Sequence, residues 1–285
     1  MPESALGVIG GSGLYEMEGL TDITRIRLET PFGDPSDAFI EGRLGDQRMI
    51  FLPRHGVGHR LLPGEINFLA NVWGMKKLGA ERIISVSAVG SMKEHIKPGH
   101  LVFVDQFVDR TRHRPETFFG GGVIVHVPMA QPVSPPLQKA LVKAAEGRAT
   151  FHDGGTYICI EGPQFSTRAE SEVFRSWGVD VIGMTNMPEA RLAREAEIAY
   201  ATIALVTDYD CWHDDEASVT VEAVLKILHE EVERAKSVIE AYVRGPREPL
   251  CEMSCTATRT SLMTPVENIP PARRAELAPI FDPFL

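Results

Sequence analysis

Short apolar runs alternate along this chain with longer segments in which apolar residues recur at helical spacing. A run of four to eight apolar residues that is bounded by turn residues is typical of a buried β-strand. The predicted strands lie at residues 6–9, 49–52, 82–88, 101–104, 157–160, 179–182 and 201–206. Several of them run into glycine-containing turns, where the main chain can approach a ligand closely. We therefore expect strand ends that are built for binding.

Segments between these runs carry the helical signals. Pro63 begins a predicted helix, since proline is favoured in the first turn, and Ser166 or Thr167 is expected to cap another. The predicted helices extend over residues 63–79, 191–197, 219–242 and 273–280. Alternation of strand and helix predicts an α/β protein with three layers.

The chain length allows either one large α/β domain or two small ones. No long linker and no shift in composition divides the 285 residues. We expect a single domain over residues 1–285, in which the proline-richer segment 246–285 is a C-terminal extension packed on the rest.

Charge and composition exclude several classes of protein. A net charge of -10 argues against a general nucleic-acid binder, which usually carries a basic stripe. No apolar run approaches the roughly 20 residues of a membrane span, and the opening residues are interrupted by glycines too early for a signal peptide. The sequence contains neither a CxxC nor an HExxH spacing, so no metal site is predicted. A cytoplasmic protein without nucleic-acid, membrane or metal partners is expected, with Cys251 and Cys255 as unpaired thiols.

Two carboxylates directly follow the apolar run at residues 201–206. Asp208 and Asp210 are two positions apart, so in extended backbone they point the same way. Ligands of open α/β sheets bind outside the carboxyl ends of the strands. An ionised carboxylate only accepts hydrogen bonds, whereas a protonated one can also donate. The pair would suit adenine, whose exocyclic amine lies beside N7; the alternative is a solvated turn, which aspartate also favours.

Small polar or cationic residues follow several other predicted strands. Hydroxyl, N–H and guanidinium donors can together surround an anion. The candidates are Ser12, Arg54, His55, Ser87, Ala88 and Thr185. The glycine-rich turn around Ser12 could by itself be purely structural, and Arg54 with His55 could be a surface pair. The convergence of separate strand ends favours an anion site.

Two further side chains are candidates for contact with a nucleoside. Phe165 could stack on a flat base, and Met184, beside Thr185, would suit the face of a sugar above a phosphate. Both residue types are also ordinary core fillers. These assignments depend on the rest of the pattern.

Nine motifs, taken together, resemble the trimeric purine nucleoside phosphorylase family, in its methylthioadenosine phosphorylase branch. They occur in order between residue 7 and about residue 245 as GVIGGSGL, ETPFGDPSD, PRHGVGH, SAVGSMKEHIKPG, DQFVDRT, HVPMAQP, EGPQFSTRAES, VIGMTNMPEARLAREAEI and ALVTDYDCW. The resemblance implies a single-domain α/β/α sandwich around a mixed central sheet. It also implies homotrimers, or homohexamers built from two trimers.

The resemblance implies a role for each candidate residue. The six candidate anion ligands match the phosphate site, and Met184 matches the ribose contact. The base pocket matches Ile160, Phe165, Ser166, Asp208 and Asp210. The 5′ pocket matches Val221 and Val224, with His59 near it and His126 contributed by the neighbouring subunit. The segment after Gly245 departs from the better-known trimeric enzymes, so the residue that closes the 5′ pocket is not assigned.

The implied reaction is phosphorolysis of 5′-deoxy-5′-methylthioadenosine to adenine and 5-methylthioribose 1-phosphate. Inorganic phosphate is then a co-substrate, and no cofactor is expected. Asp208 is the expected proton donor to N7, and Asp210 is expected to orient the exocyclic amine. The alternative within the family is a broader purine nucleoside phosphorylase that acts on adenosine or on 6-oxopurine nucleosides.

Two other classes remain open. A dinucleotide-dependent oxidoreductase would use the first glycine-rich turn, but Glu16 stands where the fingerprint needs its third glycine. A nucleoside-binding protein without activity would bind its ligand without consuming phosphate. The presence of both Asp208 and Arg54 argues against it.

Overall fold

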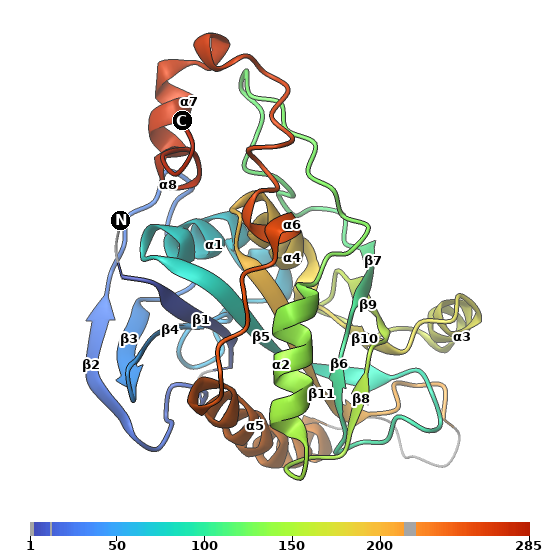
Figure 1. The fold of residues 1–285 in the computed structure, drawn as a ribbon. Coiled ribbons are helices and arrows are strands. Elements are labelled where there is room, and N and C mark those ends of the chain that lie inside the picture. The colour runs from blue at the N-terminus through green and yellow to red at the C-terminus, as the bar shows by residue number, and fades with distance from the viewer. Residues whose placement is uncertain (1–2, 12, 214–220) are drawn as a thin grey trace.

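The computed structural model describes residues 3–11, 13–213 and 221–285 of the chain. Its strands are β1 (Ala5–Gly10), β2 (Leu20–Ile26), β3 (Phe39–Leu44), β4 (Gln47–Pro53), β5 (Ala80–Ser91), β6 (Leu101–Phe103), β7 (Gln106–Arg110), β8 (Phe151–Asp153), β9 (Thr156–Ile160), β10 (Val181–Gly183) and β11 (Ala199–Asp208). They form one sheet with the main order β2-β3-β4-β1-β5-β10-β9-β7 (Figure 1). The sheet branches at β5, because β11 pairs with both β5 and β6, and β6 pairs with β8.

The sheet is mixed, as the family resemblance implied. β5 pairs in parallel with β1 and β11 and antiparallel with β10. Neighbouring residues of the central strands enter opposite cores, since successive side chains of a strand point to opposite faces. Ile9 packs in the core on one face, and Val8 packs in the core on the other. Burial on both faces explains the continuous apolar runs of the sequence.

Helices cover both faces of the sheet. On one face lie α1 (Phe68–Lys77) and α4 (Asn186–Glu195), and on the other lie α2 (Pro135–Ala145) and α5 (Val221–Arg244) (Figure 1). The three-layer α/β/α sandwich is therefore confirmed. A further helix, α3 (Arg168–Ser176), lies beyond the β9–β10 end of the sheet.

The C-terminal segment carries α6 (Glu252–Cys255), η2 (Val266–Asn268), α7 (Pro271–Glu276) and α8 (Ala278–Phe281). It is tied to the rest of the chain at more than one place. The indole nitrogen of Trp73 donates a 2.9 Å hydrogen bond to the carbonyl of Glu276, and Phe281 is buried. The main-chain N–H of Met263 donates to the carbonyl of Ile124, 2.9 Å away, in the segment between β7 and α2. Of these elements, α7 and α8 form the projection in Figure 1.

Several predicted helix limits are wrong, and local capping explains them. The helix expected from Pro63 is a short 3-10 turn, η1 (Pro63–Glu65), and α1 begins only at Phe68, because the Asn67 side chain accepts from the Ala70 N–H and caps it. Thr167, one of the two expected caps, does cap α3 through a capping box with Glu170.

Other predicted limits also differ from the structure. α4 begins at Asn186 instead of residue 191, and the single helix expected over residues 273–280 is divided into α7 and α8 at Leu277. β5 continues to Ser91, because Gly90 and Ser91 pair with β10. The elements β2, β3, β7, β8 and α2 were not predicted, and the exposed edge strand β2 has no apolar run to reveal it.

Two features are absent from the residues that the structure describes. No helix among them is long and apolar enough to cross a membrane. No group of three or more histidine, cysteine, aspartate or glutamate side chains among them is arranged to hold a metal ion. All four cysteines are free thiols.

Candidate active site

The pairing of β5 with its neighbours brings the candidate residues together. In the β5–β11 register, Ser87 lies opposite Ala204 and Gly90 lies opposite Asp208. β10 pairs antiparallel with β5 at Gly90, and Met184 and Thr185 follow directly after β10. Residues from three separate parts of the sequence therefore meet along the last half of β5.

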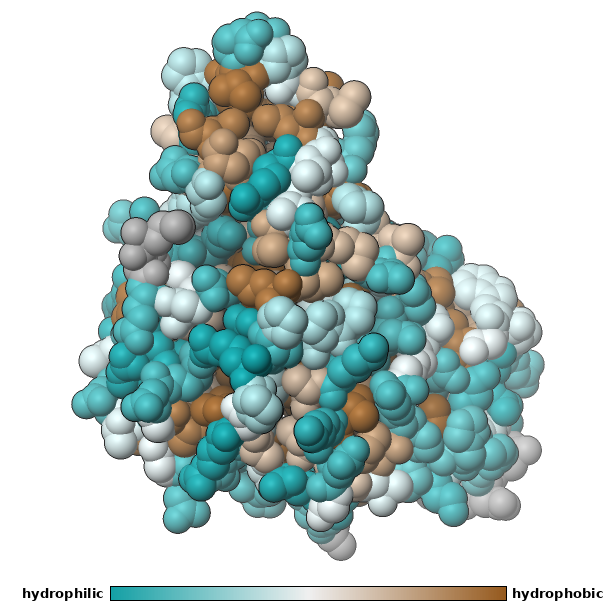
Figure 2. Space-filling view, in the orientation of Figure 1, coloured by the Kyte–Doolittle hydropathy of each residue, from teal (hydrophilic) through white to brown (hydrophobic). Residues whose placement is uncertain are grey.

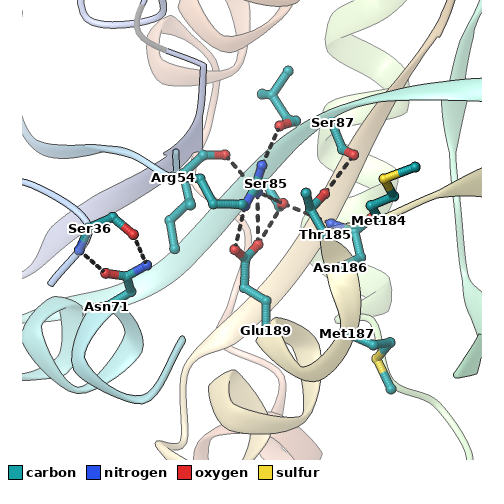
Figure 3. A network of polar contacts seen from close by, with 12 residues as sticks. Ser36, Arg54, Asn71, Ser85, Ser87, Met184, Thr185, Asn186, Met187 and Glu189 are labelled. Carbon is teal, nitrogen blue, oxygen red and sulfur yellow. Dashed lines mark hydrogen bonds and ion pairs between the residues drawn. The ribbon is translucent and has the colours of Figure 1, made fainter. Parts of the chain in front are cut away.

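Two hydroxyls meet at the candidate phosphate end. Ser87 Oγ and Thr185 Oγ1 are 2.8 Å apart, and both residues are buried (Figure 3). The phenol of Tyr157 lies 3.3 Å from Ser87 Oγ and accepts from the Thr185 N–H. Ala88, next to Ser87, is exposed although it lies within β5. Ser87 and Ala88 are thus inside a strand, whereas the sequence placed them at its end.

Arg54 follows β4 and is almost completely buried. Its main-chain N–H donates a 2.9 Å hydrogen bond to the carbonyl of Gly10 at the end of β1. Its guanidinium forms a bidentate pair with Glu189, with Nε 2.7 Å from Oε2 and Nη2 3.0 Å from Oε1 (Figure 3). Burial opposes the arginine charge, but the Glu189 carboxylate outweighs it and raises the pKa of Arg54. The surface pair that the sequence left open is ruled out by this burial.

His55 and His59 stack on each other beside Arg54. Their ring centroids are 4.3 Å apart, and His55 Nδ1 lies 2.8 Å from the carbonyl of Leu61. Because a carbonyl only accepts, Nδ1 carries the proton and Nε2 is left as an acceptor. Burial, together with the neighbouring Arg54 charge, lowers the pKa of His55 to about 4. His55 is therefore neutral at pH 7.

The base end contains the two aspartates. Asp208 Oδ2 accepts from the Thr207 hydroxyl at 2.7 Å, and Oδ1 accepts from the Asp210 N–H at 2.8 Å. Asp210 Oδ2 accepts from the Ser171 hydroxyl at 2.5 Å. Burial raises the pKa of Asp208 and of Asp210 above their ordinary values, against these hydrogen bonds.

The sequence suggested that the two aspartates share extended backbone, and this prediction is wrong. β11 ends at Asp208, and Asp210 has a φ of +54°. The alternation of side chains in a strand therefore does not apply to this pair. The carboxylates are brought together instead by the turn, in which the Asp210 N–H folds back onto the Asp208 side chain. Both residues are partly buried, so the turn is not a solvated one.

Two glycines leave room for site residues. A Cβ at Gly90 would lie 2.9 Å from Asp208 Oδ1, and a Cβ at Gly162 would lie 2.6 Å from the sulfur of Met184. Gly162 also has a φ of +69°, which side chains rarely allow. Larger residues at either position would displace the candidate base or ribose contacts.

The remaining candidate base contacts are Ile160, Phe165 and Ser166. Ile160 ends β9, one residue beyond the Cys159–Gly183 pair with β10, so it lies near Met184. Ser166 Oγ is buried without a hydrogen-bond partner among the described residues. Phe165 is 63% exposed. Its large apolar ring therefore has no core role, which leaves it available to cover a flat ligand.

Other predicted residues fall outside this cluster or outside the described structure. Ser12 is not among the described residues, and the side chains of Val221 and Val224, in the first turn of α5, are not described either. His126 is exposed between β7 and α2, where its N–H donates to the carbonyl of Ser261 in the C-terminal segment. This contact places His126 beside the C-terminal segment.

The structure adds residues that the sequence did not single out. A buried polar cluster behind the phosphate end consists of Ser85, Asn186, Glu189 and Tyr200. Arg114, also buried, donates to the carbonyls of Glu161 and Met184, which flank the base end. Glu189 lies in the first turn of α4, on a helix that is otherwise buried. Because α4 also carries Arg191, Arg194 and Glu195, the sequence gives no signal that singles out Glu189.

Comparison with known proteins gives the family. The sequence profile of the phosphorylase superfamily matches residues 5–244. The S-methyl-5′-thioadenosine phosphorylase of Geobacter sulfurreducens is 58% identical over 278 residues, which is 96% of this chain and 97% of that protein. The S-methyl-5′-thioadenosine phosphorylase of Gloeobacter violaceus is 51% identical over 286 residues, covering 98% of this chain and 95% of that protein.

Solved structures show the same likeness. A methylthioadenosine phosphorylase from an antarctic soil metagenomic library superposes with a TM-score of 0.92 at 44% identity, covering 98% of this chain and 99% of that chain. The methylthioadenosine phosphorylase of Schistosoma mansoni, in complex with adenine, gives a TM-score of 0.83 at 34% identity, covering 92% of this chain and 99% of that chain. The chain therefore belongs to the phosphorylase superfamily, in its branch of methylthioadenosine phosphorylases.

Proposed function

We propose that this protein catalyses the phosphorolysis of 5′-deoxy-5′-methylthioadenosine to adenine and 5-methylthioribose 1-phosphate. The observation that carries the proposal is the pair of partly buried carboxylates, Asp208 and Asp210, set three residues along β5 from the buried hydroxyls of the phosphate end. A proton donor for a base and a set of anion ligands thus lie on neighbouring strands. Family membership supports a nucleoside and phosphate as substrates.

In the proposed reaction a phosphate oxygen forms a bond to C1′ while the bond from C1′ to N9 of adenine breaks. The sugar passes through an oxocarbenium-like state, which the phosphate anion can stabilise before it bonds. The electron pair of the broken bond goes to the base, and Asp208 donates a proton to N7, so that adenine leaves as a neutral molecule. Burial favours the protonated form of Asp208 that this step requires.

The aspartates also account for the choice of base. A 6-oxopurine has a carbonyl where adenine has an amine, and a carboxylate facing that carbonyl would oppose two acceptors. A buried polar group without a partner costs about 1–3 kcal/mol. A chain that prefers inosine would be expected to have asparagine at the position of Asp208. We therefore propose specificity for 6-aminopurines.

At the phosphate end, we propose that Ser87, Thr185 and Arg54 hold the anion below the sugar, together with Ser12, His55 and Ala88. Met184 faces the ribose, and Ile160, Phe165 and Ser166 surround the base. His59, Val221 and Val224 belong to the proposed 5′ pocket. Positioning of the two reactants supplies much of the rate, so no cofactor is proposed.

We propose that the working unit is a homotrimer or a homohexamer. Apolar side chains gather on the projection that α7 and α8 form (Figure 2). Met263, in the C-terminal segment, and Ile124, whose carbonyl accepts from the Met263 N–H, are 65% and 55% exposed. Exposed apolar patches of this kind mark surfaces for association. His126 is exposed and its main-chain N–H donates to Ser261 of the C-terminal segment, where a neighbouring subunit could receive it in its 5′ pocket. The single domain over residues 1–285 and the cytoplasmic location stay predictions.

The test is release of free base from methylthioadenosine and from inosine, each with and without phosphate. Adenine released only with phosphate, with little or no hypoxanthine, is the expected result. Hypoxanthine released faster than adenine would contradict the proposed role of the aspartates in selecting the base. Release of neither base would leave binding without turnover as the better account.

A further inference from the structure

The polar cluster behind the phosphate end is unusual in its charge balance. Arg54 and Glu189 have side chains that are only 2% and 1% exposed, and they form a bidentate ion pair. His55, the other candidate cation nearby, is neutral at pH 7, because burial lowers its pKa to about 4. The described groups of the phosphate end therefore carry a formal charge close to zero, although the site is proposed to bind an anion.

The hydrogen-bond donors of Arg54 are already largely occupied. Nε and Nη2 face the Glu189 carboxylate, and Nη2 also lies 2.6 Å from Ser85 Oγ. Nη1 donates to the carbonyl of Val86 at 3.0 Å. Nη2 also lies 3.2 Å from the carbonyl of Ile9. Of the five N–H bonds of a guanidinium, the second one on Nη1 has no acceptor among the residues that the structure describes and is left for an external ligand. Arg54 in this arrangement cannot hold phosphate with its bidentate fork.

Two hydroxyls hold the Glu189 carboxylate in place against the Arg54 guanidinium. The hydroxyls of Ser85 and Tyr200 donate to Glu189 Oε1 at 2.7 Å and 2.9 Å. Asn186 Nδ2 donates to the hydroxyl oxygens of Ser85 and Tyr200, so the protons of these two hydroxyls are directed toward the Glu189 carboxylate. Figure 3 shows Glu189, Ser85 and Asn186 around the end of the Arg54 side chain. The cluster therefore selects an acceptor with a full negative charge at this position.

We propose that Glu189 is a positioning residue that holds the Arg54 fork away from phosphate and neutralises its charge, so that phosphate affinity is kept low. The inference rests on the proposed function, in which Arg54 belongs to the phosphate site. Phosphate bound to an arginine without a partner would be held by charge in the ground state as strongly as in the transition state, and such uniform binding does not raise the rate of the chemical step. Neutral donors can position the anion without that penalty.

The variant Glu189→Gln tests the proposal. An amide can accept from one Arg54 nitrogen but offers a second donor where the other oxygen accepted, so Arg54 loses its bidentate partner and its charge becomes uncompensated. A bound anion then takes the place of the missing carboxylate. By linkage, phosphate stabilises this variant more than the wild type. We expect a dissociation constant for phosphate about tenfold lower, a lower KM for phosphate, and no increase in kcat.

The readout is thermal unfolding over a series of phosphate concentrations, which reports binding without turnover. Glu197→Gln is the matched control, because Glu197 is a second buried carboxylate paired with an arginine, Arg259, at 2.6 Å. It lowers Tm but leaves the phosphate-dependent shift as in the wild type. Glu189→Asp keeps the charge and is expected to bind phosphate within about threefold of the wild type. It serves as the test if Glu189→Gln does not fold.

The outcomes separate this inference from the proposed function. A wild-type protein that shows neither a phosphate-dependent Tm shift nor phosphate-dependent adenine release would overturn the proposed function itself. A wild-type shift that is unchanged or smaller in Glu189→Gln would overturn the inference alone, since Glu189 would then only support the fold or aim Arg54 at phosphate. Weakened phosphate binding in a folded Glu189→Asp, where Glu189→Gln does not fold, would overturn it in the same way.

Discussion

The two ends of the candidate site treat buried charge in opposite ways. At the phosphate end, Arg54 is paired with Glu189, and both charges are retained. At the base end, Asp208 and Asp210 have neutral donors as their partners, the Thr207 and Ser171 hydroxyls and a main-chain N–H. Burial without a compensating cation raises the pKa of both aspartates. One end therefore holds its buried charges as an ion pair, and the other has carboxyl groups whose protonated form is favoured by burial.

This difference matches the two tasks of a phosphorolysis. Phosphate must be positioned, and a fixed arrangement of donors does this without proton transfer. Adenine must receive a proton as it leaves. A carboxyl group can supply one only if a fraction of the enzyme molecules has that group protonated at the working pH. An ion pair would serve the second task poorly, because a nearby cation would keep the carboxylate ionised.

The largest effect is expected from Asp208→Asn. The amide keeps the shape of the side chain but cannot donate a carboxyl proton to N7, so turnover of methylthioadenosine should fall by about 10²–10⁴-fold. Steady-state adenine release at saturating phosphate measures it. Because burial raises the pKa of Asp208, wild-type activity should decline as pH rises through that raised value, and the variant should lose this dependence. Turnover kept within a few-fold would exclude Asp208 as the acid.

Removal of the cation at the other end should act mainly on stability. Arg54→Met leaves the Glu189 carboxylate buried without a cation, which costs about 3–5 kcal/mol in the free energy of unfolding at pH 7. Protonation of the unpaired carboxyl relieves this cost, so the loss should shrink as pH falls. Denaturant unfolding at two pH values measures it. Arg259→Met is the control, with a smaller loss, because the Arg259 side chain is 37% exposed. Equal losses at both pH values would contradict the paired-charge account.

Deletion of one hydroxyl at each end should give smaller effects of different kinds. Tyr200→Phe and Ser171→Ala each remove one donor to a carboxylate and should cost about 1 kcal/mol of stability. Ser171→Ala should also raise the pKa of Asp210, which is proposed to orient the exocyclic amine, and so move the pH profile of kcat/KM for methylthioadenosine upward by up to about one unit. Tyr200→Phe should leave that profile in place. A profile moved equally by both variants would remove the distinction between the two ends.

The smallest expected effect is an absence of pH dependence. Sulfate keeps its charge over the whole range between about pH 5 and 8, in which an unperturbed histidine would titrate. Because the pKa of His55 is lowered to about 4, no histidine charge should appear at the phosphate end in this range. The Tm shift caused by sulfate should therefore be flat. A shift that grows as pH falls through about 6.5 would mean that His55 is protonated on binding.

The sequence predicted most of the central sheet because a strand buried on both faces has a continuous apolar run in the sequence. The runs at residues 6–9 and 201–206 correspond to β1 and β11, whose continuous burial follows from helices on both faces. The edge strand β2 has no such run, because most of its side chains face solvent. The predicted helix limits were wrong where a side-chain cap or a break in the helix sets the limit, as at Asn67 and Leu277.

Within the site, residue type was predictable and pairing was not. Asp208, Arg54, Ser87 and Thr185 were singled out because a carboxylate, a guanidinium or a hydroxyl beside a strand end suggests binding. Nothing in the local sequence relates Arg54 to Glu189, which is 135 residues away along the chain. The turn that gives Asp210 a φ of +54° was also not visible, since the residue types fit extended backbone equally well.

By itself, the sequence determined the layers of this protein, the strands that form its centre, and the chemical groups at their ends, since these depend on local periodicity and residue type. Only the tertiary structure decided which charges are compensated. The distance between two side chains, and the water removed from them, are set by how distant segments pack. That packing gives Arg54 a carboxylate and, within the described residues, gives Asp208 neutral donors, so that buried charge is paired at one end of the site and the carboxyl pKa is raised at the other.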